Sequence, residues 1–209
     1  MQLPSLTSSI GIRRAGAGCV LWLTGLSGAG KSTIAGKLAR KLAGLGRNVC
    51  VLDGDVVRCG LCSDLDFSPG DRKENIRRVA EVAKLFADAG VICVVALISP
   101  YRFDRQMARR IAGRNPFVEI HVNAPLEICE RRDPKGLYAR ARTGQIKHFT
   151  GISAPYEPPE KPELELRTDK MNAAKSVEMV LNFIDGIIGK DAIHQSISRD
   201  ANLARRRRR

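Results

Sequence analysis

Residues 25–33 read Gly-Leu-Ser-Gly-Ala-Gly-Lys-Ser-Thr, and they follow the spacing G-x-x-x-x-G-K-S of a phosphate-binding loop, or P-loop. An apolar run at 19–24 precedes them and an amphipathic pattern follows, which supplies the strand and the helix that this loop joins. Glycines let successive backbone N–H groups turn toward phosphate oxygens, and the helix start adds the positive end of its dipole. The sequence therefore predicts that a nucleoside triphosphate binds to Gly25, Leu26, Ser27, Gly28, Ala29, Gly30, Lys31, Ser32 and Thr33.

Two side chains of the P-loop carry further chemistry. Lys31 is expected to place a positive charge on the β- and γ-phosphates, and Ser32 is expected to offer a hydroxyl ligand to Mg²⁺. The loop thus predicts a phosphate cradle with its own cation and a metal ligand.

Composition limits the alternatives. With 209 residues and 44% hydrophobic content, the chain can bury one good core. The net charge is +13, and Arg205–Arg209 supply five of the positive charges. Such a chain suits a polyanionic small molecule or a nucleic acid, but an aromatic content of 5% gives little support for a base-stacking surface. Four of the six cysteines lie in or beside apolar runs, which fits a reducing compartment, and no apolar stretch approaches the ~20 residues of a membrane span. We therefore expect a cytoplasmic protein.

The two ends of the chain differ from its middle. Residues 1–18 contain no acidic residue and predict a disordered extension, although their composition faintly resembles an organelle transit segment. Residues 190–209 predict a basic disordered tail, and 19–189 predict a single domain. The pair Cys59 and Cys62 has the form C-x-x-C, which leaves open a regulatory disulfide or half of a zinc site.

Apolar runs alternate with amphipathic segments through that domain. We expect strands at 19–24, 48–52, 91–98, 117–122 and 164–167, with helices at 31–45, 69–89, 103–113, from 125 onward and at 172–188. This order predicts an α/β fold, a three-layer sandwich in which a five-stranded parallel sheet has helices on both faces, as in small-molecule P-loop kinases. The basic, Gly- and Pro-punctuated segment at about 131–162 predicts a lid.

Polar side chains follow the ends of the predicted strands, where ligands bind in open α/β sheets. Asp53 and Asp55 follow one strand, and either could orient Mg²⁺ or accept a proton from a hydroxyl group. In the helix at 69–89, Arg72, Asn75 and Arg78 recur at three-residue spacing, so they face either the crevice or solvent.

Two further segments predict the surroundings of single residues. In the helix at 103–113 we expect Arg105, Arg109 and Arg110 on the solvent side. His121 lies in a strand, where we expect a local hydrogen bond and no catalytic role.

Seven stretches in order closely resemble the adenylyl-sulfate kinases, which phosphorylate the ribose 3′-hydroxyl of adenosine 5′-phosphosulfate to give 3′-phosphoadenosine 5′-phosphosulfate in sulfate assimilation. They are GLSGAGKST at 25–33, LDGD at 52–55, FSPGDRKENIRR at 67–78, AEVAKLFADAG at 80–90, ISPYR at 98–102, RDPKGLYARAR at 132–142 and FTGI at 149–152. The resemblance spans about residues 19–168 and implies a kinase that uses ATP and Mg²⁺.

The resemblance also implies roles for individual residues. Ser32 and Asp55 would lie beside the metal, and Lys31, Asp55 and Ser99 would be catalytic. The substrate would contact Asp55, Arg58, Phe67, Arg72, Asn75, Ile98, Ser99, Lys135 and Phe149, with the two phenylalanine rings enclosing its adenine. The family is often dimeric, so the implied partners are a second copy, the small-molecule substrate and ATP sulfurylase, without a membrane or a nucleic acid.

Ser99 and Val56 leave questions open. Ser99 matches the family's phosphoserine position, but direct in-line transfer needs no covalent relay, so a hydrogen-bonding role is the alternative. Val56 stands where the family has asparagine, and we expect the lost amide to weaken substrate binding. The alternatives are a catalytically silent homologue, a P-loop kinase for another small hydroxyl compound, and a nucleic-acid-binding protein that uses ATP as a switch.

Overall fold

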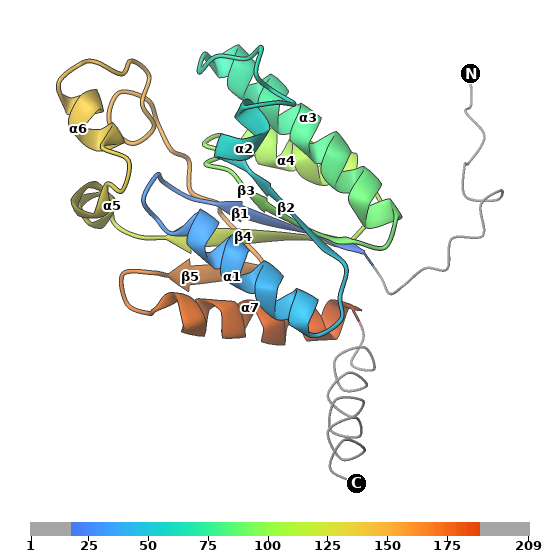
Figure 1. The fold of residues 1–209 in the computed structure, drawn as a ribbon. Coiled ribbons are helices and arrows are strands. Elements are labelled where there is room, and N and C mark those ends of the chain that lie inside the picture. The colour runs from blue at the N-terminus through green and yellow to red at the C-terminus, as the bar shows by residue number, and fades with distance from the viewer. Residues whose placement is uncertain (1–17, 189–209) are drawn as a thin grey trace, which may run out of the picture.

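A five-stranded parallel sheet forms the centre of the computed structural model, which describes residues 18–188 (Figure 1). Its strands are β1 (Cys19–Thr24), β2 (Val49–Asp53), β3 (Ile92–Ala96), β4 (Phe117–Asn123) and β5 (Leu164–Arg167). They lie in the order β2-β3-β1-β4-β5, and each neighbouring pair is parallel. The P-loop follows the central strand β1, so it lies at the middle of the sheet's carboxyl edge.

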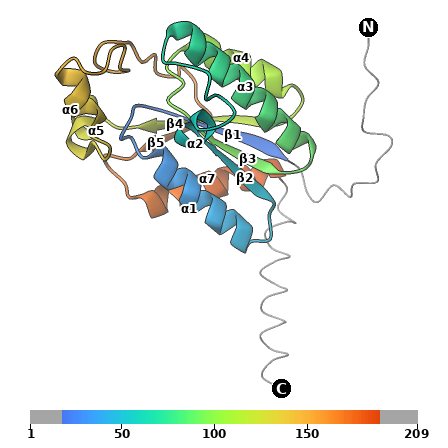
Figure 2. The same ribbon diagram turned by 45° about the horizontal axis from the view of Figure 1, so that its top comes forward.

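Helices cover both faces of this sheet (Figures 1 and 2). On one face α1 (Lys31–Gly44) packs beside α7 (Ala173–Ile188), and on the other α3 (Pro69–Asp88) packs beside α4 (Arg102–Ala112). The short helices α2 (Gly54–Arg58), α5 (Leu126–Arg132) and α6 (Leu137–Arg142) complete the set in the described residues. Both views place α5 and α6 beyond the carboxyl ends of β1 and β4. The predicted three-layer fold is confirmed.

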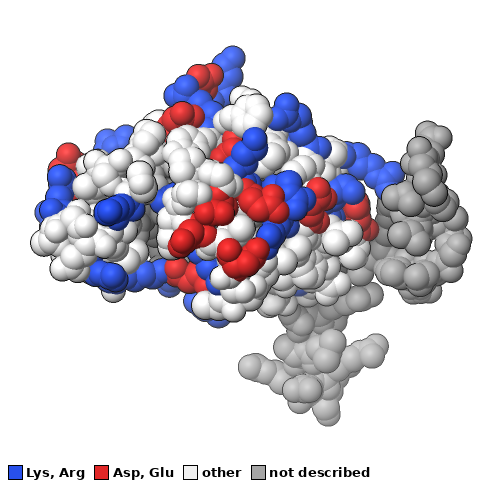
Figure 3. All heavy atoms as spheres, turned by 90° about the horizontal axis from the view of Figure 1, so that it is seen from above, with Lys and Arg blue, Asp and Glu red and all other residues white. Residues whose placement is uncertain are grey.

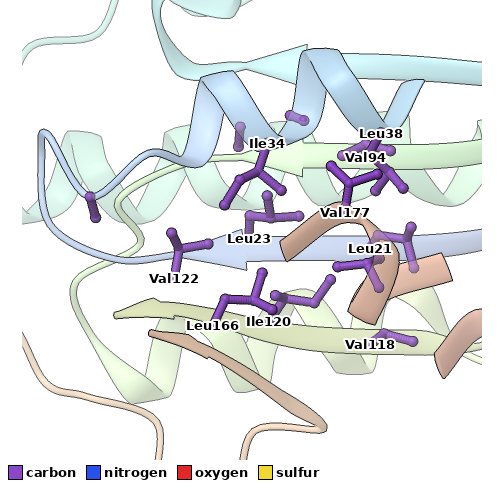
Figure 4. Packing of buried hydrophobic residues seen from close by; sticks show 14 of the residues in the cluster. Leu21, Leu23, Ile34, Leu38, Val94, Val118, Ile120, Val122, Leu166 and Val177 are labelled. Atoms are coloured by element: carbon purple, nitrogen blue, oxygen red, sulfur yellow. The ribbon is translucent and has the colours of Figure 1, made fainter. Parts of the chain in front are cut away.

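The core divides along the two faces because side chains of a strand alternate between them. Leu21 and Leu23 of β1 point toward α1 and α7 and pack with Ile34, Leu38 and Val177 (Figure 4). Their neighbours Val20 and Trp22 belong to the second cluster, under α3 and α4, where Trp22 stacks on Phe117 at 5.7 Å. All residues of β1 and β3 are buried, which explains their continuous apolar runs.

Local signals explain where elements begin and end. The hydroxyl of Ser68 accepts a hydrogen bond from Asp71 N–H, and Pro69 opens α3, so the predicted cap is confirmed. The third strand is shorter than the expected 91–98. Its sheet pairing ends at Ala96, and the Thr24 hydroxyl instead donates to the carbonyl of Ile98 at 2.7 Å. Leu97 N–H still donates to the Leu23 carbonyl at 3.2 Å, so the chain leaves the sheet after this residue, and residues 97–100 line a cavity.

The outer face of α3 and α4 carries both signs of charge (Figure 3). Glu74 pairs with Arg77 and Arg78, and Lys84 pairs with Asp88, all at helical spacing. Acidic side chains gather near the middle of this view. The face seen there is therefore not the uniform basic stripe expected of a nucleic-acid surface.

Some expectations reach beyond what the structure describes. The predicted N-terminal extension and the basic tail from 190 lie outside the described residues, apart from Gly18. Within 18–188, no helix combines the length and apolar character needed to cross a membrane.

Candidate functional site

A cavity of about 1000 Å³ lies at the carboxyl edge of the sheet. The P-loop forms one wall, and α2, α3, the loop after β3 and the segment 131–162 contribute the others. Most of the predicted site residues line this one volume, namely Ser27, Gly28, Ala29, Gly30, Lys31, Ser32, Thr33, Asp55, Arg58, Phe67, Arg72, Asn75, Ile98, Ser99, Lys135 and Phe149. Gly25 and Leu26 do not line it.

The P-loop needs glycine where its backbone meets other elements. A β-carbon at Gly25 would lie 2.3 Å from the carbonyl oxygen of Val122, and one at Gly28 would lie 2.8 Å from that of Cys129. Both residues also have positive φ angles, 151° and 74°. These positions therefore fix the loop against β4 and α5 as well as shaping its turn.

Lys31 is held inside the P-loop. Its Nζ donates to the carbonyl oxygens of Gly25 and Leu26, each at 2.8 Å, which gives these two residues a role behind the cradle. Burial lowers the pKa of Lys31 to about 8, an effect that Asp53 and Asp55 partly oppose. A phosphate anion beside this amine would favour its charged form.

The two candidate carboxylates at the start of α2, Asp53 of its N-cap and Asp55 of its first turn, differ in role. Asp53 Oδ1 accepts a hydrogen bond from Asp55 N–H at 3.0 Å, so this side chain caps the helix. The carboxylate of Asp55 instead pairs with Lys135 from the segment 131–162. Asp55 is therefore the carboxylate that reaches across the cavity.

Cationic and aromatic side chains from α2, from α3 and from the loop between them form another wall of the cavity, opposite the P-loop. The guanidinium groups of Arg58 and Arg72 lie 4.2 and 5.6 Å from the ring centre of Phe67. Arg72 also donates to Thr150 Oγ1 at 3.2 Å and to the His148 carbonyl at 2.9 Å. Arg72 thus attaches the segment 131–162 to α3.

Asn75 lines the same wall with an unsatisfied group. The residue is 4% exposed, and its Oδ1 has no hydrogen-bond partner. Since buried acceptors are normally paired, this oxygen is suited to an N–H or O–H group of a bound ligand.

Phe149 belongs to the segment 131–162, which contacts the P-loop through Tyr138. Its buried ring packs edge-on against Tyr138, with ring centres 5.0 Å apart, and the Tyr138 hydroxyl donates to the Ser27 carbonyl at 3.0 Å. Phe67 comes from another element and is 54% exposed. The two rings therefore reach one cavity from separate walls.

Ser99 occupies a constrained position at the end of β3. Its φ angle is 46°, which is uncommon for a residue with a β-carbon. Its Oγ accepts a hydrogen bond from Trp22 Nε1 at 3.0 Å. Within residues 18–188, no carboxylate or imidazole hydrogen-bonds to this hydroxyl, so it lacks the adjacent base that activates a serine nucleophile.

The structure contradicts one sequence expectation, the solvent-facing position of Arg105, and decides between the two alternatives for Arg78. Arg78 does not line the cavity, because it pairs with Asp64 and Glu74. Arg105 is 2% exposed and not on the solvent side; the small residues Ala108 and Ala112, three and seven positions on, were the signal that marks its buried stripe. His121 stacks on Tyr156, with 6.0 Å between ring centres.

Val56 is also placed differently from the expectation. Its side chain is 70% exposed and does not line the cavity. An asparagine amide at this position would therefore point largely into solvent, and the argument that Val56 weakens substrate binding loses its basis.

Sequence reasoning missed part of the cavity wall beside the P-loop. Thr168 Oγ1 donates to the Ala29 carbonyl at 2.7 Å, and Arg132 donates to the Gly28 carbonyl at 3.3 Å. Thr168 directly follows β5, so the rule that ligands bind at strand ends could have found it. Arg132 carried no signal beyond its place in a basic segment.

The C-x-x-C pair lies in the turn after α2 with both thiols free. Cys59 is exposed and donates its S–H to the Asp55 carbonyl at 3.2 Å, whereas Cys62 is buried. No group of three or more metal-binding side chains occurs among the described residues. The pair is therefore not part of a built metal site in this part of the chain.

Comparisons with known proteins agree on one family. A family described as adenylylsulphate kinase matches residues 17–167. An adenylyl-sulfate kinase of Clostridium acetobutylicum is 54% identical over 167 residues, covering 80% of this chain and 83% of that protein. One of Vibrio parahaemolyticus is 56% identical over 163 residues, covering 78% and 80%. A solved Mycobacterium tuberculosis APS kinase, in complex with AMPPNP and APS, aligns with TM-score 0.79 and 46% identity over 81% of this chain and 99% of that one.

Proposed function

The chain belongs to the adenylyl-sulfate kinase family, and we propose that it phosphorylates adenosine 5′-phosphosulfate (APS). The γ-phosphoryl group of ATP would pass to the ribose 3′-hydroxyl, so that a bond forms between O3′ and the γ-phosphorus while the bond to the β,γ-bridging oxygen breaks. The products would be 3′-phosphoadenosine 5′-phosphosulfate and ADP. One observation carries the proposal: a P-loop faces a wall of arginine, phenylalanine and asparagine side chains across a single cavity.

The P-loop wall would hold the phosphates of ATP. Backbone N–H groups and the start of α1 favour anions, and Lys31 would exchange its two carbonyl contacts for phosphate oxygens. The hydroxyl of Ser32 and the carboxylate of Asp55 line the same cavity, and both are hard oxygen donors of the kind that suit Mg²⁺. When bound, Mg²⁺ would neutralise charge on the β- and γ-phosphate oxygens.

The opposite wall would hold the acceptor. Arg58 and Arg72 would bind the phosphosulfate, whose negative charges suit the guanidinium fork. Phe67 and Phe149 would contact the adenine from two sides, and the free Oδ1 of Asn75 would accept a hydrogen bond from the nucleoside. The assignment is supported by the way these groups gather around one volume.

Three residues would act at the reacting atoms. Asp55 would orient the acceptor hydroxyl and take its proton, and its present partner Lys135 would move to the phosphates. We propose direct in-line transfer in which Ser99 donates a hydrogen bond to the substrate, because its hydroxyl has a tryptophan donor and no base beside it. Ile98 would contact the substrate from the same strand end.

We extend the proposal to the organisation of the protein. The segment 131–162 would act as a lid over the kinase domain at 19–189, and Lys135 and Arg72 are its links to the opposite wall. The protein would work in the cytoplasm as a homodimer, supplied with APS by ATP sulfurylase. These statements follow the family resemblance.

A coupled assay with Mg·ATP and APS, run with and without a reductant, tests the proposed function. We expect APS-dependent release of ADP, and calorimetry should show that APS binds when ADP is present whereas nucleoside monophosphates and sugars do not. Turnover of another hydroxyl compound with no response to APS would contradict the proposal. Salt-sensitive nucleic-acid binding as the sole ATP-linked property would also contradict it.

A further inference from the structure

A buried hydrogen-bond cluster joins the end of β1, the loop after β3 and the C-terminal part of the proposed lid, 131–162. We call Thr24, Ser99, Arg105 and Tyr156 the junction cluster. None of these residues is more than partly exposed, and Thr24, Ser99 and Arg105 are between 0 and 3% exposed. Thr24 directly precedes the P-loop, and Ser99 lines the acceptor side of the cavity. The cluster therefore lies where the parts of the proposed site meet.

Arg105 is the centre of this cluster. Its Nη1 donates to the Ser99 carbonyl at 2.7 Å and its Nη2 to the Glu157 carbonyl at 2.7 Å. Its Nε pairs with Glu119 Oε1 of β4 at 2.6 Å. Each nitrogen of the guanidinium group thus holds a different element, and the carboxylate compensates the buried charge. A lysine could not replace this planar arrangement.

Arg105 stabilises a backbone conformation of Ser99 that would be unfavourable without its surroundings. The positive φ angle of Ser99 persists only if its surroundings hold it. Arg105 holds the Ser99 carbonyl, and the fully buried Trp22 donates to its hydroxyl oxygen. Because that oxygen accepts from the protein interior, the hydroxyl proton is left to donate to a ligand in the cavity.

Tyr156 links the same loop to the end of the lid. Thr24 has one hydroxyl proton and donates it to the Ile98 carbonyl at 2.7 Å, so in the 3.1 Å contact between hydroxyls Tyr156 is the donor. Burial raises the pKa of Tyr156 to about 12, which keeps this donor protonated. Glu157, the next residue, has its carbonyl held by Arg105. The cluster therefore fixes the acceptor loop and the end of the lid to each other.

We propose that Arg105 is a positioning residue for acceptor binding: it holds Ser99 and the end of the lid so that the acceptor wall matches APS. This inference rests on the proposed function. It predicts a selective defect, because Arg105 hydrogen-bonds to Ser99, Glu119 and Glu157, whereas Lys31 hydrogen-bonds within the P-loop to Gly25 and Leu26. Loss of the guanidinium fork should weaken APS binding and leave nucleotide binding almost unchanged.

Calorimetric titration of the full chain tests the proposal, with ADP and then with APS in the presence of saturating ADP. For Arg105→Lys we expect the Kd of APS to rise about 10-fold, the loss of one charged hydrogen bond, while the Kd of ADP stays within about twofold. Arg109→Lys is the matched control, since Arg109 lies one turn along α4 and also approaches Glu119, at 3.8 Å, but donates to Phe117 and Glu163 instead of Ser99. It should leave both dissociation constants unchanged.

A double-mutant cycle separates positioning from general damage. Glycine adopts a positive φ angle without strain, so in a Ser99→Gly background Arg105→Lys should raise the Kd of APS by no more than about threefold. An undiminished effect in that background, or equal weakening of ADP and APS, would overturn the proposal. If Arg105→Lys fails to fold, Tyr156→Phe decides: a rise of about threefold for APS alone supports it, and no change overturns it.

APS binding by the parent protein distinguishes a failure of this inference from a failure of the proposed function. A parent chain that binds no APS contradicts the proposed function and this inference with it. Normal APS binding by the parent and equally normal binding by Arg105→Lys contradict the inference alone.

Discussion

The two walls of the cavity are built in different ways. The P-loop wall consists of backbone and a buried lysine, and hydrogen bonds from Tyr138, Arg132 and Thr168 hold its carbonyl groups. The acceptor wall consists of side chains, among them a half-exposed Phe67 and an asparagine oxygen without a partner. The first wall is complete before a ligand arrives, whereas the second keeps groups that only a ligand can satisfy.

The two walls should also differ in their contribution to the stability of the folded protein. The backbone of the P-loop serves both stability and binding. Its close contacts at the glycines and the hydrogen bonds to its carbonyl groups fix the loop in the folded protein, and its N–H groups would bind phosphate. A buried polar atom without a partner costs stability until it is paired. Substitutions should therefore affect the two walls differently. On the P-loop side they should impair phosphoryl transfer, and on the acceptor side they should weaken substrate binding while they stabilise the folded protein.

The largest effect is expected on the P-loop wall. Lys31→Met removes the cation beside the phosphates, and we expect kcat/KM to fall about 1000-fold, as for the loss of one charged group that stabilises a transition state. Steady-state assay of ADP release measures this. Lys37→Met, on an exposed position of α1, is the control and should retain full activity. A Lys31→Met variant that keeps a tenth of the parent activity would contradict the assigned role.

On the acceptor wall, Asn75→Leu should act in two directions. The Kd of APS should rise about 10-fold through a lost hydrogen bond, and the free energy of unfolding should increase by about 1 kcal/mol because an unsatisfied buried oxygen is removed. Calorimetry and urea unfolding measure these changes. Asn115→Leu is the control: it loses a bond to Asp88, so it should lower stability and leave APS binding unchanged. A destabilised Asn75→Leu would show that the oxygen has a partner.

A smaller effect is expected where the walls meet. Ser99→Ala should retain about a fifth of the parent turnover, the loss of one hydrogen bond, because direct transfer needs no serine nucleophile. Kinetic assay and mass spectrometry of the parent during turnover measure this. Abolished activity together with a trapped phosphoserine in the parent would show a covalent relay instead.

Nucleotide binding should also take up protons near pH 8. In the free protein the pKa of Lys31 is about 8, and a bound polyphosphate favours its charged form and so raises that pKa. At pH 8 the free amine is about half protonated, so ATP binding without APS should take up about half a proton. At pH 7 the amine is already charged and uptake should be smaller. Calorimetry in buffers of different ionisation enthalpy measures this, and equal uptake at both values would contradict it.

The smallest effect is expected outside both walls. Val56→Asn restores the family's residue, but the side chain is largely exposed and away from the cavity. The KM for APS should therefore change by no more than about twofold, less than the loss of one hydrogen bond. A larger improvement in the coupled assay would mean that position 56 contacts substrate.

The same contrast explains what could be predicted from the sequence. The P-loop is contiguous, so its spacing predicted the loop, and the apolar patterns directly before and after it predicted its strand and its helix. The residues proposed to bind the acceptor are spread from Asp55 to Phe149. Strand ends and helix spacing indicated Asp55, Arg72 and Asn75, but only the family resemblance placed Arg58, Phe67 and Phe149 in the same site. Local patterns could not choose between Asp53 and Asp55, because the choice depends on which carboxylate caps α2.

The surroundings of Arg105 could not be predicted from the sequence. An arginine in an amphipathic helix was expected to face solvent, but tertiary contacts with Ser99, Glu119 and Glu157 bury it. The compensating carboxylate lies on a strand 14 residues away, and the two carbonyl groups belong to irregular backbone. No local pattern contains this information.

The ion pair between Asp55 and Lys135 has a consequence for the order of events at the cavity mouth. Both side chains are about half exposed or more, so the pair is weak and easily exchanged. In the proposed mechanism, Asp55 would hold the metal cation, and the Lys135 ammonium group would then be free to bind an anion. Cation binding would therefore precede and favour anion binding, and in the free protein the two charges neutralise each other.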